Sequence, residues 1–193
     1  MLGLLNTVLS KGNTLLTYVK DGLVMANRFL TPPKLTFPVS GSAAFNGTSD
    51  FIQTANSFSH TNHTIAAWVY VDDTATNKIL FDNRDANDDG LAIYLDSTEQ
   101  IYYLLNTSDL GPFSISADNW VFVTATYDGT TQKFYIDGSL SGSQSASQTI
   151  SVLSDSKIGS QNVPSSNYFK GNLANVAIWN RALTSDEINS VMW

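Results

Sequence analysis

Acidic and amide side chains crowd one short stretch of the sequence. Residues 82–90 read DNRDANDDG, and the apolar run LAIYL and Asp96 follow them. Carboxylate and amide oxygens are the ligands that Ca²⁺ takes in proteins, provided that several of them converge. Asp and Asn also form tight turns without any ion, because their side chains accept hydrogen bonds from nearby backbone amides. The stretch therefore has two interpretations, a calcium loop and a polar turn.

One template for a calcium loop is the EF-hand type. Asp85, Asn87 and Asp89 take its alternating ligand positions, Gly90 takes the sharp turn, and Asp96 takes the last ligand position. Two features oppose this template. The run LAIYL has the composition of a strand, and the last ligand is an Asp where such loops use a bidentate Glu.

Catalytic constellations are hard to find in the chain. Glycoside hydrolysis generally needs two carboxyls about 5–9.5 Å apart. The only glutamates, Glu99 and Glu187, do not form a paired run, and cysteine nucleophiles are excluded because there is no cysteine. His60 and His63 have a metal-ligand spacing, but a solvated loop is the simpler interpretation. The sequence predicts a protein that is not an enzyme.

Charge is unevenly distributed along the chain. The formal net charge is −7, with +3 in residues 1–40 and −10 in residues 41–193. An acidic total argues against nucleic acid as a partner, since phosphate binding depends on clustered Lys and Arg. No apolar run approaches the roughly 18 to 20 residues of a membrane span. The amino terminus also lacks the pattern of a secretory signal, so we expect a product made without one.

The chain separates into two regions near residue 40. Apolar residues recur at spacings of three and four in residues 1–40, which suits a short amphipathic helix that ends at Pro32, whereas Gly12 and Gly22 oppose a helix and leave an extended arm as the alternative. This region either packs on the rest of the domain or forms a basic, apolar arm that docks on other protein subunits. The docking residues would be Leu15, Leu16, Val19, Lys20 and Leu23.

Residues 41–193 show short β-rich runs between turn residues, a pattern typical of an all-β sandwich. The clearest hairpin is WVFVTATY-DG-TTQKFYID, in which Asp128 and Gly129 supply the tight turn. The segment TSDEINSVMW predicts a short helix capped by Thr184 or Ser185. We therefore expect two antiparallel sheets, preceded by the arm of residues 1–40 and followed by a short C-terminal helix.

Five segments carry a family resemblance. They are AAFNGTSDFIQ, FSHTNHTIAAWVYV, NWVFVTATYDGTTQKFYIDG, KIGS and YFKGNLANVAIWNRALTSDEINSV, in this order over about residues 41–191. The chain resembles the LamG-like jelly-roll domain of the concanavalin A-like lectin and glucanase superfamily, with a distant likeness to pentraxins. This resemblance implies a jelly-roll sandwich of two antiparallel sheets.

The pentraxin likeness implies a second template for calcium. It places Asp88 and Asp89 on the acidic and amide pair that precedes a strand, and Gln161 and Asn162 on the companion loop after KIGS. The companion loop has no carboxylate in this chain, which weakens the implied double site. Calcium is the only cofactor that the sequence suggests.

Carbohydrate recognition needs an exposed aromatic side chain beside polar groups. Phe113, Tyr168 and Phe169 lie in candidate loops, although each could instead cover the edge of the sandwich. Our first hypothesis is a non-catalytic surface-binding module, such as a viral or phage capsid decoration or tail protein, attached through its arm to capsid or tail subunits or to a second copy. The alternative is a calcium-assisted lectin-like domain that binds surface glycans, and a glycosidase is the third. The expected location is a virion or an extracellular surface.

Overall fold

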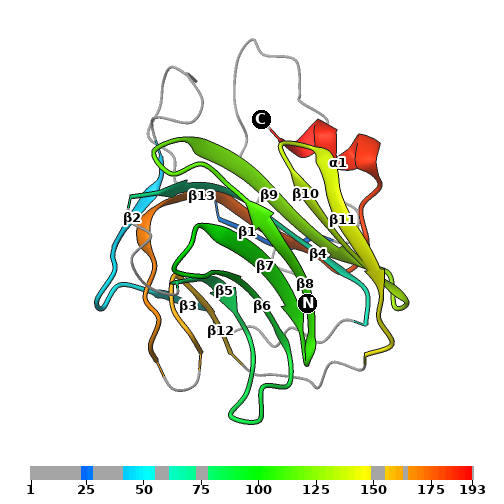
Figure 1. Ribbon diagram of the computed structural model, residues 1–193, viewed down its shortest axis with the longest axis horizontal. Coiled ribbons are helices and arrows are strands. Elements are labelled where there is room, and N and C mark those ends of the chain that lie inside the picture. The colour runs from blue at the N-terminus through cyan, green and yellow to red at the C-terminus, as the bar shows by residue number, and fades with distance from the viewer. Residues whose placement is uncertain are drawn as a thin grey trace, which may run out of the picture.

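A computed structural model describes residues 23–27, 41–54, 61–72, 78–148, 155–162 and 165–192. Two antiparallel sheets pack face to face, and one short helix lies beside the turn that joins β10 and β11 (Figure 1). This arrangement confirms the jelly-roll sandwich with a short C-terminal helix. Within the described part of the chain, no helix has the length and apolar character that crossing a membrane requires.

The two sheets differ in size. The seven-stranded sheet has the order β1 (Leu23–Asn27), β13 (Lys170–Trp179), β4 (His63–Val71), β9 (Trp120–Tyr127), β10 (Thr131–Ile136) and β11 (Ser139–Ser145), and β2 (Ala43–Asn46) also pairs with β13. The six-stranded sheet has the order β3 (Ile52–Thr54), β12 (Ser156–Ile158), β5 (Lys78–Asp82), β6 (Leu91–Leu95), β7 (Gln100–Leu105) and β8 (Ser108–Ser114).

The seven-stranded sheet is buried on both faces along β4 and β9. Ile65 and Val69 point into the main core between the sheets, whereas Ala66 belongs to a second apolar cluster on the outer face. Helix α1 (Ser185–Val191) covers this outer face, with Ile188 completely buried. Two buried faces explain why these strands are apolar at almost every position.

Helix α1 begins at a capping box. Thr184 accepts a hydrogen bond from the backbone of Glu187, and Glu187 accepts one from the backbone of Thr184 at 2.9 Å. Arg181 adds a two-pronged ion pair to Glu187, at 2.7 and 2.8 Å. These bonds satisfy the backbone amides of Thr184 and Glu187 and fix the start of the helix.

The ion pair at Glu187 gives the fold a dependence on acid. Hydrogen bonds from Arg181 and from the Thr184 backbone lower the pKa of Glu187 from 4.5 to about 2. The unfolded chain therefore takes up this proton at a higher pH than the folded chain, and stability falls as the pH drops from about 4.5 towards 2. Glu187→Gln should be less stable than wild type at pH 7, with the difference shrinking below pH 4.5 in urea melts. An equal difference at pH 7 and pH 3 would contradict this role.

The structure describes residues 23–27 of the predicted arm, and they do not form a helix. Leu23 lies in β1, opposite Trp179 of β13, so residues 23–27 form an edge strand of the seven-stranded sheet and not the end of a helix. Pairing with β13 satisfies the backbone hydrogen-bonding groups of these residues. This pairing outweighs the helical preference that the spacing of the apolar residues indicates. The other predicted docking residues lie outside the described residues; they are Leu15, Leu16, Val19 and Lys20.

Candidate functional site

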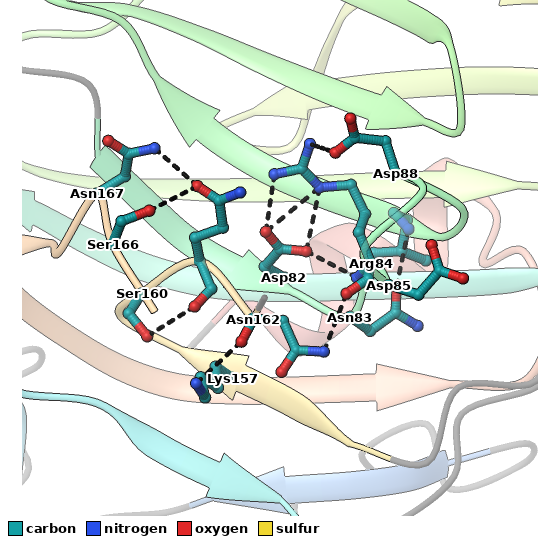
Figure 2. A network of polar contacts seen from close by, with 12 residues as sticks. Asp82, Asn83, Arg84, Asp85, Asp88, Lys157, Ser160, Asn162, Ser166 and Asn167 are labelled. Carbon is teal, nitrogen blue, oxygen red and sulfur yellow. Dashed lines mark hydrogen bonds and ion pairs between the residues drawn. The ribbon is translucent and has the colours of Figure 1, made fainter. Parts of the chain in front are cut away.

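A buried ion pair lies where β5 ends. The Asp82 carboxylate has no exposed surface, and Arg84 turns back over it (Figure 2). Arg84 Nη2 lies 2.8 Å from Asp82 Oδ2, and Nε lies 3.1 Å from Oδ1. The Arg84 backbone amide also donates to Oδ1 at 2.7 Å. A fork of this kind holds the guanidinium in one orientation.

Burial and ion pairing shift the pKa values of Asp82 and Arg84 in opposite directions. Burial raises the pKa of Asp82, and the hydrogen bonds and charge of Arg84 offset only part of that rise. Burial lowers the pKa of Arg84, but Asp82 and Asp88 raise it overall. The carboxylate therefore depends on Arg84 to stay charged in the interior.

The loop after β12 joins this ion pair. Asn162 Nδ2 donates to the Arg84 carbonyl at 3.0 Å, and the Asn162 backbone amide bonds to Asp82. Lys157 Nζ donates to the Asn162 carbonyl at 3.0 Å. The structure thus brings Asp82 at the end of β5 and Arg84 in the next loop together with Asn162 in the loop after β12 (Figure 2). The pentraxin likeness named Asn162 but neither Asp82 nor Arg84.

Protein donors already occupy side-chain oxygens of two residues of the second calcium template, Asp88 and Gln161. Asp88 accepts from Arg84 Nη1 at 3.1 Å. Gln161 Oε1 accepts from Ser166 Oγ and from Asn167 Nδ2, each at 2.9 Å. The Arg84 guanidinium lies between Asp82 and Asp88, so this loop pair carries its own cation. Among the described residues, no three His, Cys, Asp or Glu side chains gather as a metal site. The donor set does not fit Ca²⁺.

The EF-hand template is wrong, because its ligands do not converge. Asp85 Oδ1 accepts the backbone amides of Asn87 at 2.8 Å and Asp89 at 3.0 Å, which makes the loop a polar turn. Strand β6 then separates this turn from Asp96 by five extended residues, about 17 Å. Asp96 accepts instead from Thr98 and from other groups of the next turn.

A stacked tyrosine pair stands on the outer face of the six-stranded sheet. Tyr94 and Tyr102 are opposite in register, and their neighbours along the strands point into the main core. The two rings lie 4.9 Å apart and nearly parallel, at 5°. Tyr94 donates its hydroxyl to Asp109 Oδ2 at 2.9 Å, and Tyr102 donates to Asp96 Oδ2 at 3.2 Å. Both rings are half-buried.

The sequence contained a signal for this pair that was missed. In LAIYLDSTEQIYYLLN, the turn at residues 96–99 makes a hairpin, and the alternation of the two strands places Tyr94 and Tyr102 on one face. The backbone of β8 supports the second ring, because a Cβ at Gly111 would lie 2.7 Å from Tyr102 Cδ1. Glycine at this position lets β8 approach the ring closely.

The aromatic residues that the sequence predicted for glycan binding lie elsewhere. Phe169 is completely buried and meets the edge of Phe45 at 5.9 Å, so it fills the core and its prediction is wrong. Phe113 is half-buried and stacks on Phe134 at 5.3 Å, against the main core. Tyr168 is half-buried on the loop before β13 and stays a prediction. Both phenylalanine side chains pack against the apolar core, because neither has a polar group that would need a hydrogen-bond partner at the surface.

The histidine pair also departs from expectation. His63 is fully buried in β4, and its Nε2 lies 2.5 Å from the Tyr103 hydroxyl. The solvated-loop interpretation of His63 is therefore wrong, and the residue serves as a core partner for two tyrosines, Tyr103 and Tyr127. His60 lies outside the described residues.

Comparison with known families identifies the class of protein to which this fold belongs. A family model described as the concanavalin A-like lectin/glucanases superfamily (Laminin_G_3) matches residues 46–189. This match covers most of the chain, and the chain belongs to that family. No curated protein sequence matches the chain.

Several solved structures share the fold. A heptameric SAP-like pentraxin from Limulus polyphemus is 19% identical, with a TM-score of 0.63 over 78% of this chain and 80% of that one. The Botulinum neurotoxin serotype D ligand-binding domain in complex with N-acetylneuraminic acid is 15% identical, with a TM-score of 0.66 over 89% and 50%. A Trypanosoma rangeli sialidase in complex with the inhibitor DANA is 20% identical, with a TM-score of 0.61 over 80% and 27%. The chain thus spans about half of the toxin domain and about a quarter of the sialidase, and these likenesses show the fold alone.

Proposed function

We propose that the protein is a non-catalytic module that binds glycans on the outer face of its six-stranded sheet. The observation that carries this proposal is the stacked pair of Tyr94 and Tyr102, held in place by Asp109 and Asp96. The ligands of two similar structures, N-acetylneuraminic acid on the toxin domain and DANA on the sialidase, are consistent with it.

The tyrosine pair offers the two kinds of contact that a sugar needs. The ring faces and edges provide an apolar surface for sugar C–H groups, and the carboxylates of Asp96 and Asp109 accept hydrogen bonds from sugar hydroxyls. The two ring hydroxyls are already bonded to these carboxylates, so the rings lose little freedom when a ligand binds.

The carboxylates on this face suit binding better than hydrolysis. A glycosidase needs a protonated general acid with a raised pKa near the bond to be cleaved. Burial raises the pKa of Asp82, but that carboxylate lies under Arg84 and has no exposed surface. Although desolvation opposes it, hydrogen bonds from Thr98, Gln100 and Tyr102 lower the pKa of Asp96, which favours its charged form.

Affinity electrophoresis through gels that contain neutral polysaccharides tests this function. We expect at least one polysaccharide to retard the protein, with no new reducing ends after prolonged incubation. New reducing ends would show an enzyme. Unretarded migration in every gel, in the presence and absence of calcium, would remove the glycan-binding proposal.

We propose that this binding does not require calcium, because Arg84 already pairs with Asp82 and Asp88, where the calcium template would place the ion. We expect the thermal melting temperature to be the same in calcium and in a chelator, since an ion that does not bind the folded state cannot stabilise it. The control is Asp89→Ala, which should respond to calcium no differently from wild type. A calcium-dependent rise in wild type that disappears in Asp89→Ala would favour the calcium-assisted lectin.

We also propose that residues 1–40 attach the module to protein subunits, on the grounds of their charge of +3 against −10 in residues 41–193. A virion or phage particle is the proposed setting. Because Leu23–Asn27 forms β1, a test should delete only residues 1–20. We expect this deletion to abolish attachment to the partner and to leave glycan binding intact. Attachment that survives the deletion would contradict the docking role.

A further inference from the structure

The outer face of the six-stranded sheet around Tyr94 and Tyr102 is called the tyrosine face below. We infer that its ligand is a neutral, hydroxyl-rich glycan and that sialylated or otherwise anionic glycans are rejected. This inference rests on the proposed glycan-binding function. It follows from how the charged groups around Tyr94 and Tyr102 are already paired.

Arg84, the cation that interacts with Tyr94, is already bonded to protein carboxylates and is not available to an anionic sugar. Arg84 interacts electrostatically with Tyr94, but its Nε and Nη2 bond to Asp82 and its Nη1 bonds to Asp88. One guanidinium thus serves two carboxylates. A ligand carboxylate could bind Nε and Nη2 only by leaving Asp82 charged and unpaired in the interior, which is strongly unfavourable, and it could bind Nη1 only by displacing Asp88.

A second cation near the same loops is also held by the protein. Lys157 Nζ donates to the Asn162 carbonyl at 3.0 Å and to the Ser165 hydroxyl, and it lies over the Phe51 ring, 4.7 Å from the centroid. Lys157 and Asp82 are opposite in register on β12 and β5. This ammonium therefore stays with the loop after β12, away from the tyrosine pair on β6 and β7.

The groups that do face a ligand at the tyrosine pair are negative. Asp109 and Asp96 each accept a tyrosine hydroxyl through Oδ2, and Asp109 is exposed. A carboxylate on a bound sugar would lie beside the charges of Asp96 and Asp109 without a compensating cation, and neighbouring like charges repel. Sugar hydroxyls, in contrast, are donors that such carboxylates bind well.

A glycan array with matched pairs tests this specificity on the full chain. The neutral probes are lactose, N-acetyllactosamine, chitotriose, mannotriose and cellotriose, and the anionic probes are the α2,3- and α2,6-sialylated forms of the first two. We expect binding to neutral members only, with any sialylated counterpart at least tenfold weaker. The double variant Asp96→Asn, Asp109→Asn should narrow that difference, because it removes the repelling charges and keeps acceptor oxygens.

The failure of this inference differs from the failure of the proposed function. Sialylated probes that bind as tightly as their neutral partners, or more tightly, would overturn the inference and leave glycan binding in place. Binding of the double variant with unchanged discrimination would also overturn it, because the carboxylates would then not be the cause. No binding to any probe would overturn the proposed function and the inference together.

Discussion

Asp82→Ala should lower the free energy of unfolding by about 3 kcal/mol, the largest loss that we expect from any single change at this site. The substitution leaves the Arg84 guanidinium, whose side chain is only 13% exposed, without its main partner. It also removes the acceptor of the Asn162 backbone amide, so the loop after β5 and the loop after β12 lose a shared hydrogen-bond partner. Urea unfolding at pH 7, followed by tryptophan fluorescence, measures this loss.

The matched control for Asp82 is the second carboxylate of the same guanidinium. Asp88 lies 3.1 Å from Arg84 Nη1, but its side chain is 66% exposed. Exposed ion pairs contribute roughly 0–1 kcal/mol, so Asp88→Asn should change the unfolding free energy very little. Equal losses in the two variants would mean that burial is not what makes the Asp82 pair important.

Tyr102→Ala should weaken glycan binding roughly 100-fold, about 2.7 kcal/mol, and so remove it from most assays. The change deletes one of the two stacked rings and the donor to Asp96, and it leaves Tyr94 without its partner. Isothermal titration with the tightest neutral glycan measures the change in affinity. The melting temperature, recorded on the same samples, shows whether the fold persists.

The control for Tyr102 is an aromatic pair on the opposite sheet. Tyr70 and Trp120 are half-buried on the outer face of the seven-stranded sheet, with ring centroids 5.6 Å apart. Tyr70→Ala removes a similar amount of aromatic surface and should leave glycan affinity unchanged. Loss of binding in Tyr70→Ala with full binding in Tyr102→Ala would move the site to the other face.

The fold could be predicted from the sequence because its signals are local. The Asp128-Gly129 turn, the cap at Thr184 and the apolar strands each demand one local structure, and all of them agree. The edge strand β1 could not be predicted, because its backbone pairs with β13, about 150 residues further along the chain. Local spacing of apolar residues in this segment favoured a helix.

The candidate site was harder to predict because it depends on contacts between distant segments. The sequence placed Asp88 and Asn162 in neighbouring loops through a family resemblance, and the structure confirms that these loops meet. It did not indicate that Arg84 would fold back between Asp82 and Asp88. That position of one side chain gives the candidate calcium loop a cation of its own, paired with two of its carboxylates.

Backbone-amide NMR in a chelator tests most directly whether the face that carries Tyr94 and Tyr102 binds a glycan without calcium. Titration with the tightest neutral glycan should shift the amides around Tyr94, Tyr102 and Asp109, and it should leave those of residues 85–89 and 161–162 in place. Shifts confined to residues 85–89 and 161–162, and seen only after calcium is added, would contradict the account.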